Sequence, residues 1–380
     1  MGVNLARLGD VGQGCQPRCC FVLGETGSCG VNGTTYRLAV KASDPYGNSG
    51  TSTLTWTVAL NPPSVTITSA PSSPGNSTSP TFGFSSPSSG ATFACSLVTT
   101  AAADAFTTCS SPKTWTNVTA GTYRFAVRVT DGNGSTATTS KTVTIDTTTP
   151  TSPGAPTGSL TSQQIGSDTA IPAKSIPLAL TWAAASDASG IASYEIWSAV
   201  GTATSSLLTT TTTNSANITV APASSYTLKV RAKDLAGNVG PFSAVTTTTA
   251  ALDQETSSRL TYTGTWTTTS LTAASGGSVR TASAANATAT LTLFAGTTKT
   301  AIVGTTGPGY GKVQVIVDGN TAAATTLDPY TPTASPRKTL LVLPTLSAGT
   351  THTIKLVVLG TRNTAASGTR VDLDAIITMN

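Results

Sequence analysis

The stretch YRLAVKASDPYGNSG at residues 36–50 recurs twice in altered form, as YRFAVRVTDGNGSTA at 123–137 and as YTLKVRAKDLAGNVG at 226–240. A catalytic motif is rarely present three times in one chain, whereas a structural module often is. Each copy begins with a tyrosine and then alternates apolar with polar residues. In the third copy the apolar residues Leu228, Val230 and Ala232 alternate with the cations Lys229, Arg231 and Lys233. A period of two with one apolar face predicts a half-buried β-strand.

Each of these strands runs into an acidic residue and then a Gly-Asn or Asn-Gly pair. The acidic residues are Asp44, Asp131 and Asp234. Glycine and asparagine tolerate the positive φ angles that a tight hairpin requires. A second alternating strand follows in every copy, at residues 53–58, 141–145 and 242–248. The repeat is therefore predicted to be a β-hairpin that closes a module.

The three hairpins resemble the last two strands of bacterial Ig-like and fibronectin type III-like β-sandwiches. In such sandwiches a tyrosine at this place forms a tyrosine corner, whose hydroxyl group bonds to nearby backbone. The resemblance implies this structural role for the leading residues Tyr36, Tyr123 and Tyr226.

The hairpin turns also carry residues that bind calcium in cadherin-type repeats. By that analogy Asp44 with Asn48, or Asp234 with Asn238, are candidate ligands. Turn chemistry explains the same residues without an ion, and it is the favoured interpretation because calcium requires a denser cluster of oxygen ligands. No metal site is therefore predicted.

Composition points to an all-β protein. The chain has 380 residues, enough for two to four domains, and 10% of them are charged, against about a quarter in ordinary domains. Short Thr- and Val-rich segments alternate with turn residues, and there is no long amphipathic helical pattern. The net charge of +5 is spread without a basic run, which argues against a nucleic-acid partner. No apolar run is long enough to span a membrane.

Four modules are predicted, at residues 1–61, 62–150, 151–251 and 252–380. The first is a partial Ig-like module with a cysteine-rich N-terminus, since it falls short of the roughly 100 residues of such a sandwich. The second resembles a tandem Ig-like repeat that opens with a strand and closes in Asp-Thr-Thr-Thr-Pro. The third resembles a fibronectin type III-like domain, whose B–C region matches SDASGIASYEIW at 186–197.

The tryptophans of these modules have two interpretations. They are Trp56, Trp115, Trp182 and Trp197. Exposed, they would be platforms for stacking sugars; in the strands of small sandwiches they more often pack in the core or at an edge. Packing is the favoured interpretation.

The last module resembles the jelly-roll, galactose-binding-like domains attached to secreted bacterial hydrolases and to surface and phage tail proteins. The matching segments are the strand end Phe294-Ala-Gly, GKVQVIVDG from 311, GTTHTI from 349 and VDLDA from 371. The Asp-Gly pair at 318–319 in the second of these is a hairpin signal and predicts a turn. In this resemblance the expected ligand contacts are on loops around Tyr310, Tyr330 and Arg337, which offer aromatic and guanidinium surface suited to sugars.

The six cysteines fall into two groups. Cys95 and Cys109 resemble the pair that Ig-like repeats of secreted bacterial proteins bridge, which implies a disulfide and an oxidising compartment. The other four, near the N-terminus, are either disulfide partners or zinc ligands. They are Cys15, Cys19, Cys20 and Cys29. Their spacing does not match the paired CxxC of zinc sites, so disulfides are favoured.

No active site is predicted. Sugar hydrolysis usually needs two carboxylates about 5–10 Å apart, and no module offers a convincing pair. A serine or cysteine nucleophile needs a base, and the chain has a single histidine, His352. A catalytic histidine needs a triad partner, so we expect His352 to be structural and without a chemical partner. No glycine-rich loop precedes a helix, so no phosphate site is expected. The chain is predicted to be a non-enzyme without a cofactor.

Three functions fit these patterns. The first is an extracellular structural or adhesive protein, with an Ig-like stalk and a terminal jelly roll, that associates with itself or with a neighbouring surface protein. The second is a carbohydrate-binding accessory protein of a secreted hydrolase system. The third is a phage tail or decoration protein, which fits an N-terminus, MGVNLARLGD, without a signal-peptide pattern.

The short first module suggests assembly. A lone hairpin at 36–58 is marginal in water, and its edges would template a strand from another chain. Completion in trans would make the chain an assembly subunit. The alternatives are that residues 1–30 supply further strands, or that the sequence begins inside a longer protein.

Overall fold

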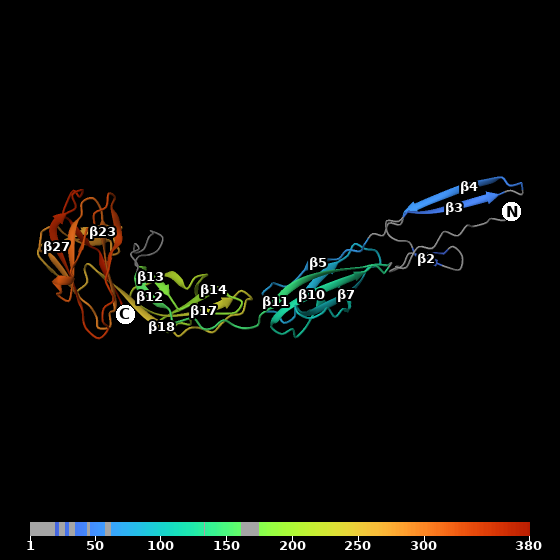
Figure 1. Cartoon of the computed structure of the whole chain (residues 1–380). Coiled ribbons are helices and arrows are strands. Elements are labelled where there is room, and N and C mark those ends of the chain that lie inside the picture. The colour runs from blue at the N-terminus through green and yellow to red at the C-terminus, as the bar shows by residue number, and fades with distance from the viewer. Residues whose placement is uncertain are drawn as a thin grey trace. The chain divides into compact units, whose positions relative to one another are not determined.

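A computed structural model describes residues 20–22, 27–29, 35–43, 46–57, 62–132, 134–160 and 175–380. These residues form β-strands and one short 3-10 helix, which confirms the all-β sandwich class (Figure 1). The chain divides into two compact units, Met1–Thr148 and Thr149–Asn380. Cys15, Cys19 and Asp44 lie outside the described residues.

The N-terminal part contains two separate two-stranded pairs. Strands β1 (Cys20–Val22) and β2 (Gly27–Cys29) pair so that Cys20 lies opposite Cys29 along the backbone. Strands β3 (Thr35–Ser43) and β4 (Ser49–Thr57) pair over nine residues each, as the repeat predicts, and the rings of Tyr36 and Trp56 stack at 5.9 Å. The disulfide pairing of the four N-terminal cysteines stays a prediction.

The second module is a sandwich of two antiparallel sheets, ordered β5-β6-β9 and β11-β10-β7-β8. Its strands are β5 (Thr66–Ser69), β6 (Thr81–Ser85), β7 (Thr92–Thr99), β8 (Thr107–Cys109), β9 (Lys113–Thr114), β10 (Gly121–Thr130) and β11 (Thr136–Ile145). The repeat hairpin is β10–β11, which pairs over its full length. The inward residues of β10 fall at every second position, which is why the apolar face seen in the sequence becomes the core.

Aromatic rings and one disulfide hold this core. Phe82 and Phe125 are fully buried and stack at 4.1 Å, and Trp115 meets both edge-on. Cys95 on β7 and Cys109 on β8 form a disulfide. Trp115 is therefore a packing residue here rather than a free platform.

The third module pairs a three-stranded sheet, β12-β13-β16, with a larger one that begins β15-β14-β17-β18. The strands are β12 (Thr157–Leu160), β13 (Ile176–Thr181), β14 (Ile191–Val200), β15 (Ser206–Thr211), β16 (Ser215–Val220), β17 (Ser224–Asp234) and β18 (Thr246–Gln254). Trp182 is buried and lies edge-on to Tyr194 in this core. The hydroxyl of Tyr226 accepts a hydrogen bond from the Ala221 amide, as a tyrosine corner does.

The C-terminal module is also a sandwich. Its five-stranded sheet has the order β19-β22-β27-β24-β25, and a three-stranded sheet has the order β20-β21-β28. The elements are β19 (Leu260–Thr263), β20 (Thr267–Ser270), β21 (Ser278–Ala282), β22 (Thr288–Thr292), β23 (Lys299–Thr306), β24 (Gly311–Val317), η1 (Thr321–Ala323), β25 (Thr325–Leu327), β26 (Ser335–Val342), β27 (Thr353–Arg362), β28 (Val371–Leu373) and β29 (Ala375–Met379). The assignment of this sandwich to the jelly-roll family stays a prediction.

One sheet runs through both the third and the C-terminal modules. It has seven strands in the order β15-β14-β17-β18-β29-β23-β26. Strand β18 pairs with β17 through its first half and with β29 through its second, and Ala250 takes part in both ladders (Figure 1). The predicted module boundary at 251/252 lies inside β18. The two modules are therefore joined by continuous backbone hydrogen bonding.

Strand β29 has both faces buried and serves two cores. Ile377 packs in the cluster that contains Leu178 and Val230 of the third module. Its neighbour Ile376 packs in the cluster that contains Val313 and Leu356 of the C-terminal sandwich. Alternate residues of a strand point to opposite faces, so a single strand fills both interiors.

Candidate functional site

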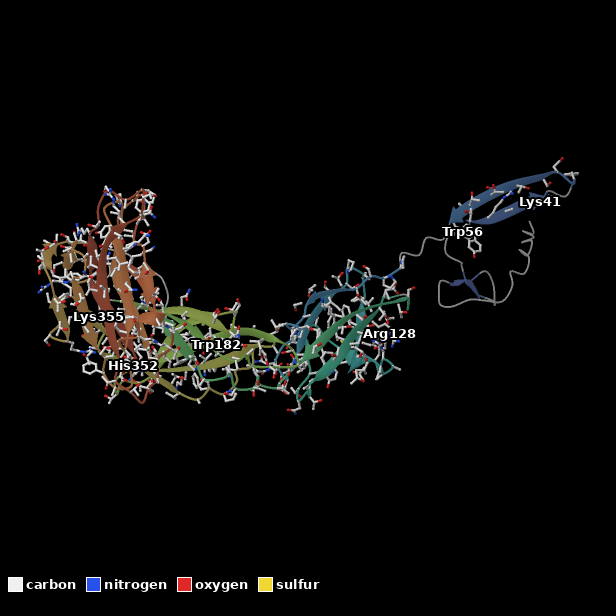
Figure 2. All side chains as sticks on the ribbon, turned by 60° about the vertical axis from the view of Figure 1, so that its left-hand side comes forward. Lys41, Trp56, Arg128, Trp182, His352 and Lys355 are labelled. Atoms are coloured by element: carbon white, nitrogen blue, oxygen red, sulfur yellow. A yellow bond between two sulfur atoms is a disulfide. The ribbon has the colours of Figure 1, made fainter. Side chains whose placement is uncertain are left out.

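Three loops meet at one end of the C-terminal sandwich because of strand register. Strand β27 lies between β22 and β24, and it pairs Thr353 with Thr292 and Ile354 with Val317. The segments that follow β22 and β24 and the segment that precedes β27 therefore lie side by side. We call residues 293–298, 318–320 and 344–352 the loop cluster. Figure 2 shows its His352 at one end of this sandwich.

An exposed aromatic ring stands on the loop cluster. Phe294 is 61% exposed, and it is the one large hydrophobic side chain so exposed in residues 252–380, all of which the structure describes. The guanidinium of Arg259 lies 3.6 Å from the centre of its ring. Arg259 is held by an ion pair to Asp253 at 2.7 Å and by donation to the Thr292 carbonyl at 3.0 Å. The ring is thus supported on one face.

His352 is held at both ring nitrogens. Nδ1 lies 2.6 Å from a carboxylate oxygen of Asp318, and Nε2 lies 2.9 Å from the carbonyl oxygen of Ser347. Both of those atoms are acceptors only, so these two contacts favour the protonated imidazole, in which both ring nitrogens donate. Hydrogen bonds to Asp318 and to the Ser347 carbonyl raise the pKa of His352. The expectation that His352 has no chemical partner is wrong.

The trio of Ser347, His352 and Asp318 has the partner order of a catalytic triad, since the Ser347 hydroxyl lies 3.1 Å from Nε2. A general base must offer a lone pair to the serine hydroxyl. Here Nε2 also lies 3.0 Å from the Thr350 hydroxyl and 2.9 Å from the Ser347 carbonyl, so it is shared among three partners of the same loop. The arrangement acts as a clamp between the loop before β27 and the turn after β24.

The sequence predicted the turn of this clamp, but not the contact between Asp318 and His352. Asp318 and Gly319 form the predicted turn, with φ angles of 52° and 71°, the left-handed conformation that Asp and Gly favour. The turn directs Asp318 toward β27, where one oxygen accepts from the Thr353 amide at 2.7 Å. Only strand pairing reveals that His352 lies next to it.

The clamp makes folding depend on pH in a stated direction. Because folding raises the pKa of His352, its contribution is complete below about pH 6.5, the value for a free imidazole, and is lost as pH rises through the folded pKa. Hydrogen bonds from His352 and Thr353 lower the pKa of Asp318, so its contribution is lost only as pH falls through that depressed value. The clamp is therefore strongest at mildly acid pH.

We predict that NMR titration will place the His352 pKa above 6.5. The protein has one histidine, so its ring carbon signal needs no assignment by mutation. In Asp318→Asn, which removes the charge but keeps the side chain's shape, the pKa is expected to fall. A wild-type pKa at or below 6.5, or one unchanged in Asp318→Asn, would contradict the clamp.

The predicted ligand residues lie elsewhere, around the start of β24. Tyr310 and Tyr330 flank Gly307, which bonds to the backbone beside each of them. Arg337 sits in an irregular part of β26, two residues beyond Ser335, which pairs with Thr306. Tyr330 and Arg337 are half-buried. A ligand role for these residues stays a prediction.

Tyr310 does not offer a free ring. It is 7% exposed, and its hydroxyl donates to Asp372 at 2.5 Å. Arg370 binds the same carboxylate through two nitrogens, at 2.6 and 2.8 Å. Burial and the bond to Asp372 raise the pKa of Tyr310. Its aromatic ring is buried by packing, and the sequence pattern could not show this burial.

A second polar group is buried where β18 ends and β29 begins. Asp374 is fully buried and accepts from the amide and hydroxyl of Ser275, at 3.0 and 2.5 Å. Glu255, 1% exposed, accepts from the Ser278 hydroxyl at 2.5 Å. Burial raises the pKa of Asp374. Two carboxylates already bonded to serines are fewer than the six to eight oxygens a calcium ion takes.

In the third module the acidic residue of the repeat stabilises the turn that follows β17. One carboxylate oxygen of Asp234 accepts from the amides of Gly237 and Asn238, at 2.6 and 2.8 Å. The other oxygen accepts from the Asn238 side chain at 2.9 Å. These bonds explain why the repeat carries an acid at this position.

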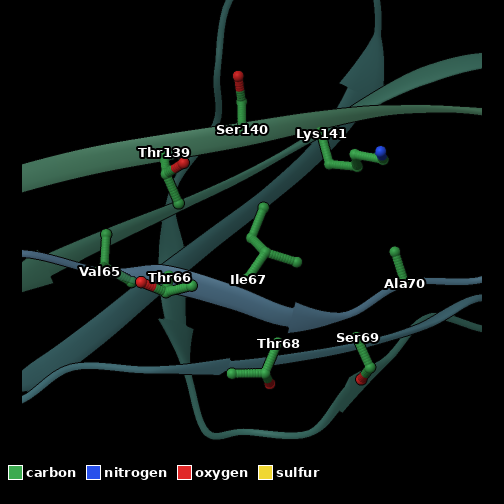
Figure 3. A pocket seen from close by; sticks show the side chains of 9 residues that line it. All are labelled: Val65, Thr66, Ile67, Thr68, Ser69, Ala70, Thr139, Ser140 and Lys141. Atoms are coloured by element: carbon green, nitrogen blue, oxygen red, sulfur yellow. The ribbon is translucent and has the colours of Figure 1, made fainter.

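A hollow of about 480 Å³ opens between β5 and β11 of the second module (Figure 3). Its floor includes Val65 and Ile67, and its walls carry threonine and serine hydroxyls with one cation, Lys141. These groups supply no nucleophile with a base beside it. The hollow therefore shows no catalytic arrangement.

Comparison with known proteins finds similarity over parts of the chain. A segment of 141 residues is 39% identical to chitinase A1 of Niallia circulans, covering 36% of this chain and 19% of that protein's length. The fibronectin(III)-like modules of Clostridium thermocellum CbhA align with 48% of this chain and 91% of theirs, at 14% identity and a TM-score of 0.29. A two-domain fibronectin type III segment of chicken tenascin aligns with 49% and 97%, at 11% identity and a TM-score of 0.19. No family model matches the chain.

Within the described ranges, the structure contains no helix with the length and apolar character needed to cross a bilayer.

Proposed function

We propose that this chain is a non-enzymatic extracellular adhesive protein that attaches to polysaccharide through the loop cluster of its C-terminal sandwich. The observation that carries the proposal is Phe294, an exposed ring fixed from one side by Arg259. An exposed aromatic ring is suited to stacking on the apolar face of a sugar. The Asp318 carboxylate of the same loop cluster is 45% exposed, and beside its bonds to His352 and Thr353 it keeps lone pairs that can accept from sugar hydroxyls.

The adhesive role fits the rest of the chain. The Cys95–Cys109 disulfide is typical of an oxidising, extracellular compartment. The third module shares a sheet with the C-terminal sandwich, so it forms a stiff support for the loop cluster. Chitinase A1 matches only part of this chain, and its name makes chitin the first polysaccharide to test.

The proposal predicts that Phe294→Ala weakens binding of the full chain to an insoluble polysaccharide at least tenfold, about 1.4 kcal/mol. Sedimentation assays with chitin, cellulose and bacterial peptidoglycan measure this loss. The matched control is Leu235→Ala in the third module, which removes a side chain of similar exposure, 58%. Equal binding by wild type and Phe294→Ala on every polysaccharide that retains the protein would refute the role of the ring.

Assembly is a second candidate function, favoured by the N-terminal hairpin. In the described part of the chain, β3 and β4 pair only with each other, and such a ribbon is marginal alone. A strand from a second copy would extend it and build a fibre or surface layer. Electron microscopy of the native protein tests this: fibres support it, and dispersed single molecules at high concentration speak against it.

A further inference from the structure

The outer face of the third module's large sheet carries an unusual set of side chains. Strand β17 turns Leu228, Val230 and Ala232 into the core, so the residues between them face outward. With two residues of β14 and one that follows β17, the outward residues form what we call the cationic–aromatic face. Its members are Glu195, Trp197, Lys229, Arg231, Lys233 and Phe242.

This face collects the positive charge of residues 175–250, the larger described part of its module. Residues 175–250, all described, contain three cations and three acids. Every cation, Lys229, Arg231 and Lys233, lies on the cationic–aromatic face. Glu195 is the only acid there, which leaves the face with a charge of +2. The concentration of charge on one side distinguishes this surface from the threonine- and serine-rich remainder.

The aromatic rings and the cations of this face contact one another. Trp197 and Phe242 meet edge-on at 5.7 Å, and the Arg231 guanidinium lies 5.0 and 4.8 Å from their ring centres. The Lys229 ammonium lies 4.2 Å from the Phe242 ring. Glu195 accepts from Trp197 at 3.0 Å and from Arg231 at 2.7 Å, which locks the two together.

Glu195 is committed to this framework. Burial opposes its ionisation, but hydrogen bonds from Trp197 and Arg231 outweigh that effect and lower the pKa of Glu195. It therefore stays charged and neutralises Arg231. Lys229 and Lys233 form no ion pair among the described residues. These two ammonium groups are available to a ligand.

We propose that the cationic–aromatic face binds an anionic polysaccharide, such as a polymer of uronic acid. Lys229 and Lys233 are four residues apart on one strand, about 13 Å, so they can meet two separate acidic groups along an extended chain. The half-buried ring of Trp197 on β14 lies beside these cations and provides apolar surface for a sugar ring. The oxidising compartment indicated by the disulfide favours a polysaccharide over a nucleic acid as the anion.

This site is independent of the loop cluster. The loop cluster offers one ring beside a carboxylate and suits a neutral sugar, whereas the cationic–aromatic face selects negative charge. Loss of Phe294 is therefore expected to leave anionic binding unchanged. The two sites would let one rigid unit hold two kinds of polymer.

The test is affinity electrophoresis of the full chain in gels that contain polygalacturonate, with neutral dextran gels as reference. The double variant Lys229→Ala/Lys233→Ala is expected to bind polygalacturonate at least tenfold more weakly than wild type. Lys229→Arg/Lys233→Arg keeps the charge and is expected to retain binding. Added salt is expected to weaken wild-type binding, because exposed charges are screened.

The control is Lys141→Ala/Lys355→Ala, which removes the same charge from exposed positions outside the face. An equal loss in this control would assign the retardation to net charge and overturn the proposal. No loss in the Lys229/Lys233 variant would overturn it as well. Tighter binding of a single-stranded DNA oligonucleotide than of polygalacturonate would overturn the choice of ligand.

Discussion

Ile377→Ala is expected to destabilise the third module and the C-terminal sandwich together. Ile377 is 1% exposed in β29, and removing such a side chain leaves a cavity that costs about 2–5 kcal/mol. It packs in the core of the third module, yet its strand is also paired in the sheet of the C-terminal sandwich. The two modules are therefore expected to open as one cooperative unit.

Hydrogen exchange read by mass spectrometry measures this coupling. Protection is expected to fall by similar factors in β13 of the third module and in β24 of the C-terminal sandwich. Val127→Ala, which opens a cavity in the second module, is the control and should leave both strands unchanged. Faster exchange in β13 alone would show that the shared sheet does not couple the modules.

Removal of the Cys95–Cys109 disulfide is expected to cost the second module about 3 kcal/mol. The two residues are 14 positions apart, and a bridge of that span restricts the unfolded chain by roughly this amount. Cys95 also lies in the core, 1% exposed, so Cys95→Ala/Cys109→Ala adds a small loss of packing. Urea denaturation followed by fluorescence measures the change.

Reduction provides the matched control. A reducing agent should lower the urea midpoint of the wild-type protein toward that of the double alanine variant and leave the variant unchanged. Peptide mapping without reduction should recover the two cysteines as one linked pair. Free thiols at both positions would rule out this contribution. So would a wild-type urea midpoint that does not change when the reducing agent is added.

Much of the fold could be predicted from the sequence, because strand alternation and the residue preferences of turns depend on neighbouring residues. The alternation after Tyr123 and Tyr226 identified both the inward residues and the outward cations Lys229, Arg231 and Lys233. The Asp-Gly pair at 318–319 marked a turn. Each of these features depends on residues within a few positions of one another, so the pattern needs no knowledge of distant contacts.

The sequence predicted the candidate site only in part. His352 was recognised as structural, but its charge partner was missed, since Asp318 is 34 positions away and reaches it only through the pairing of β24 with β27. Phe294 was predicted to lie at the end of a strand. The residues next to it in the sequence do not show that Arg259 lies against its ring. Tyr310 was selected for its aromatic surface, and the sequence did not show that its ring is buried with its hydroxyl bonded to Asp372.

Local patterns in the sequence were enough to predict an all-β protein of sandwiches with closing hairpins, and a tyrosine corner at Tyr226. Tertiary structure decided that β18 and β29 join two of the modules into one sheet. It also decided which aromatic rings remain exposed. The reason is physical: the pleat imposes a period of two on any half-buried strand, whereas strand partners and ring exposure depend on which distant segments come to lie together.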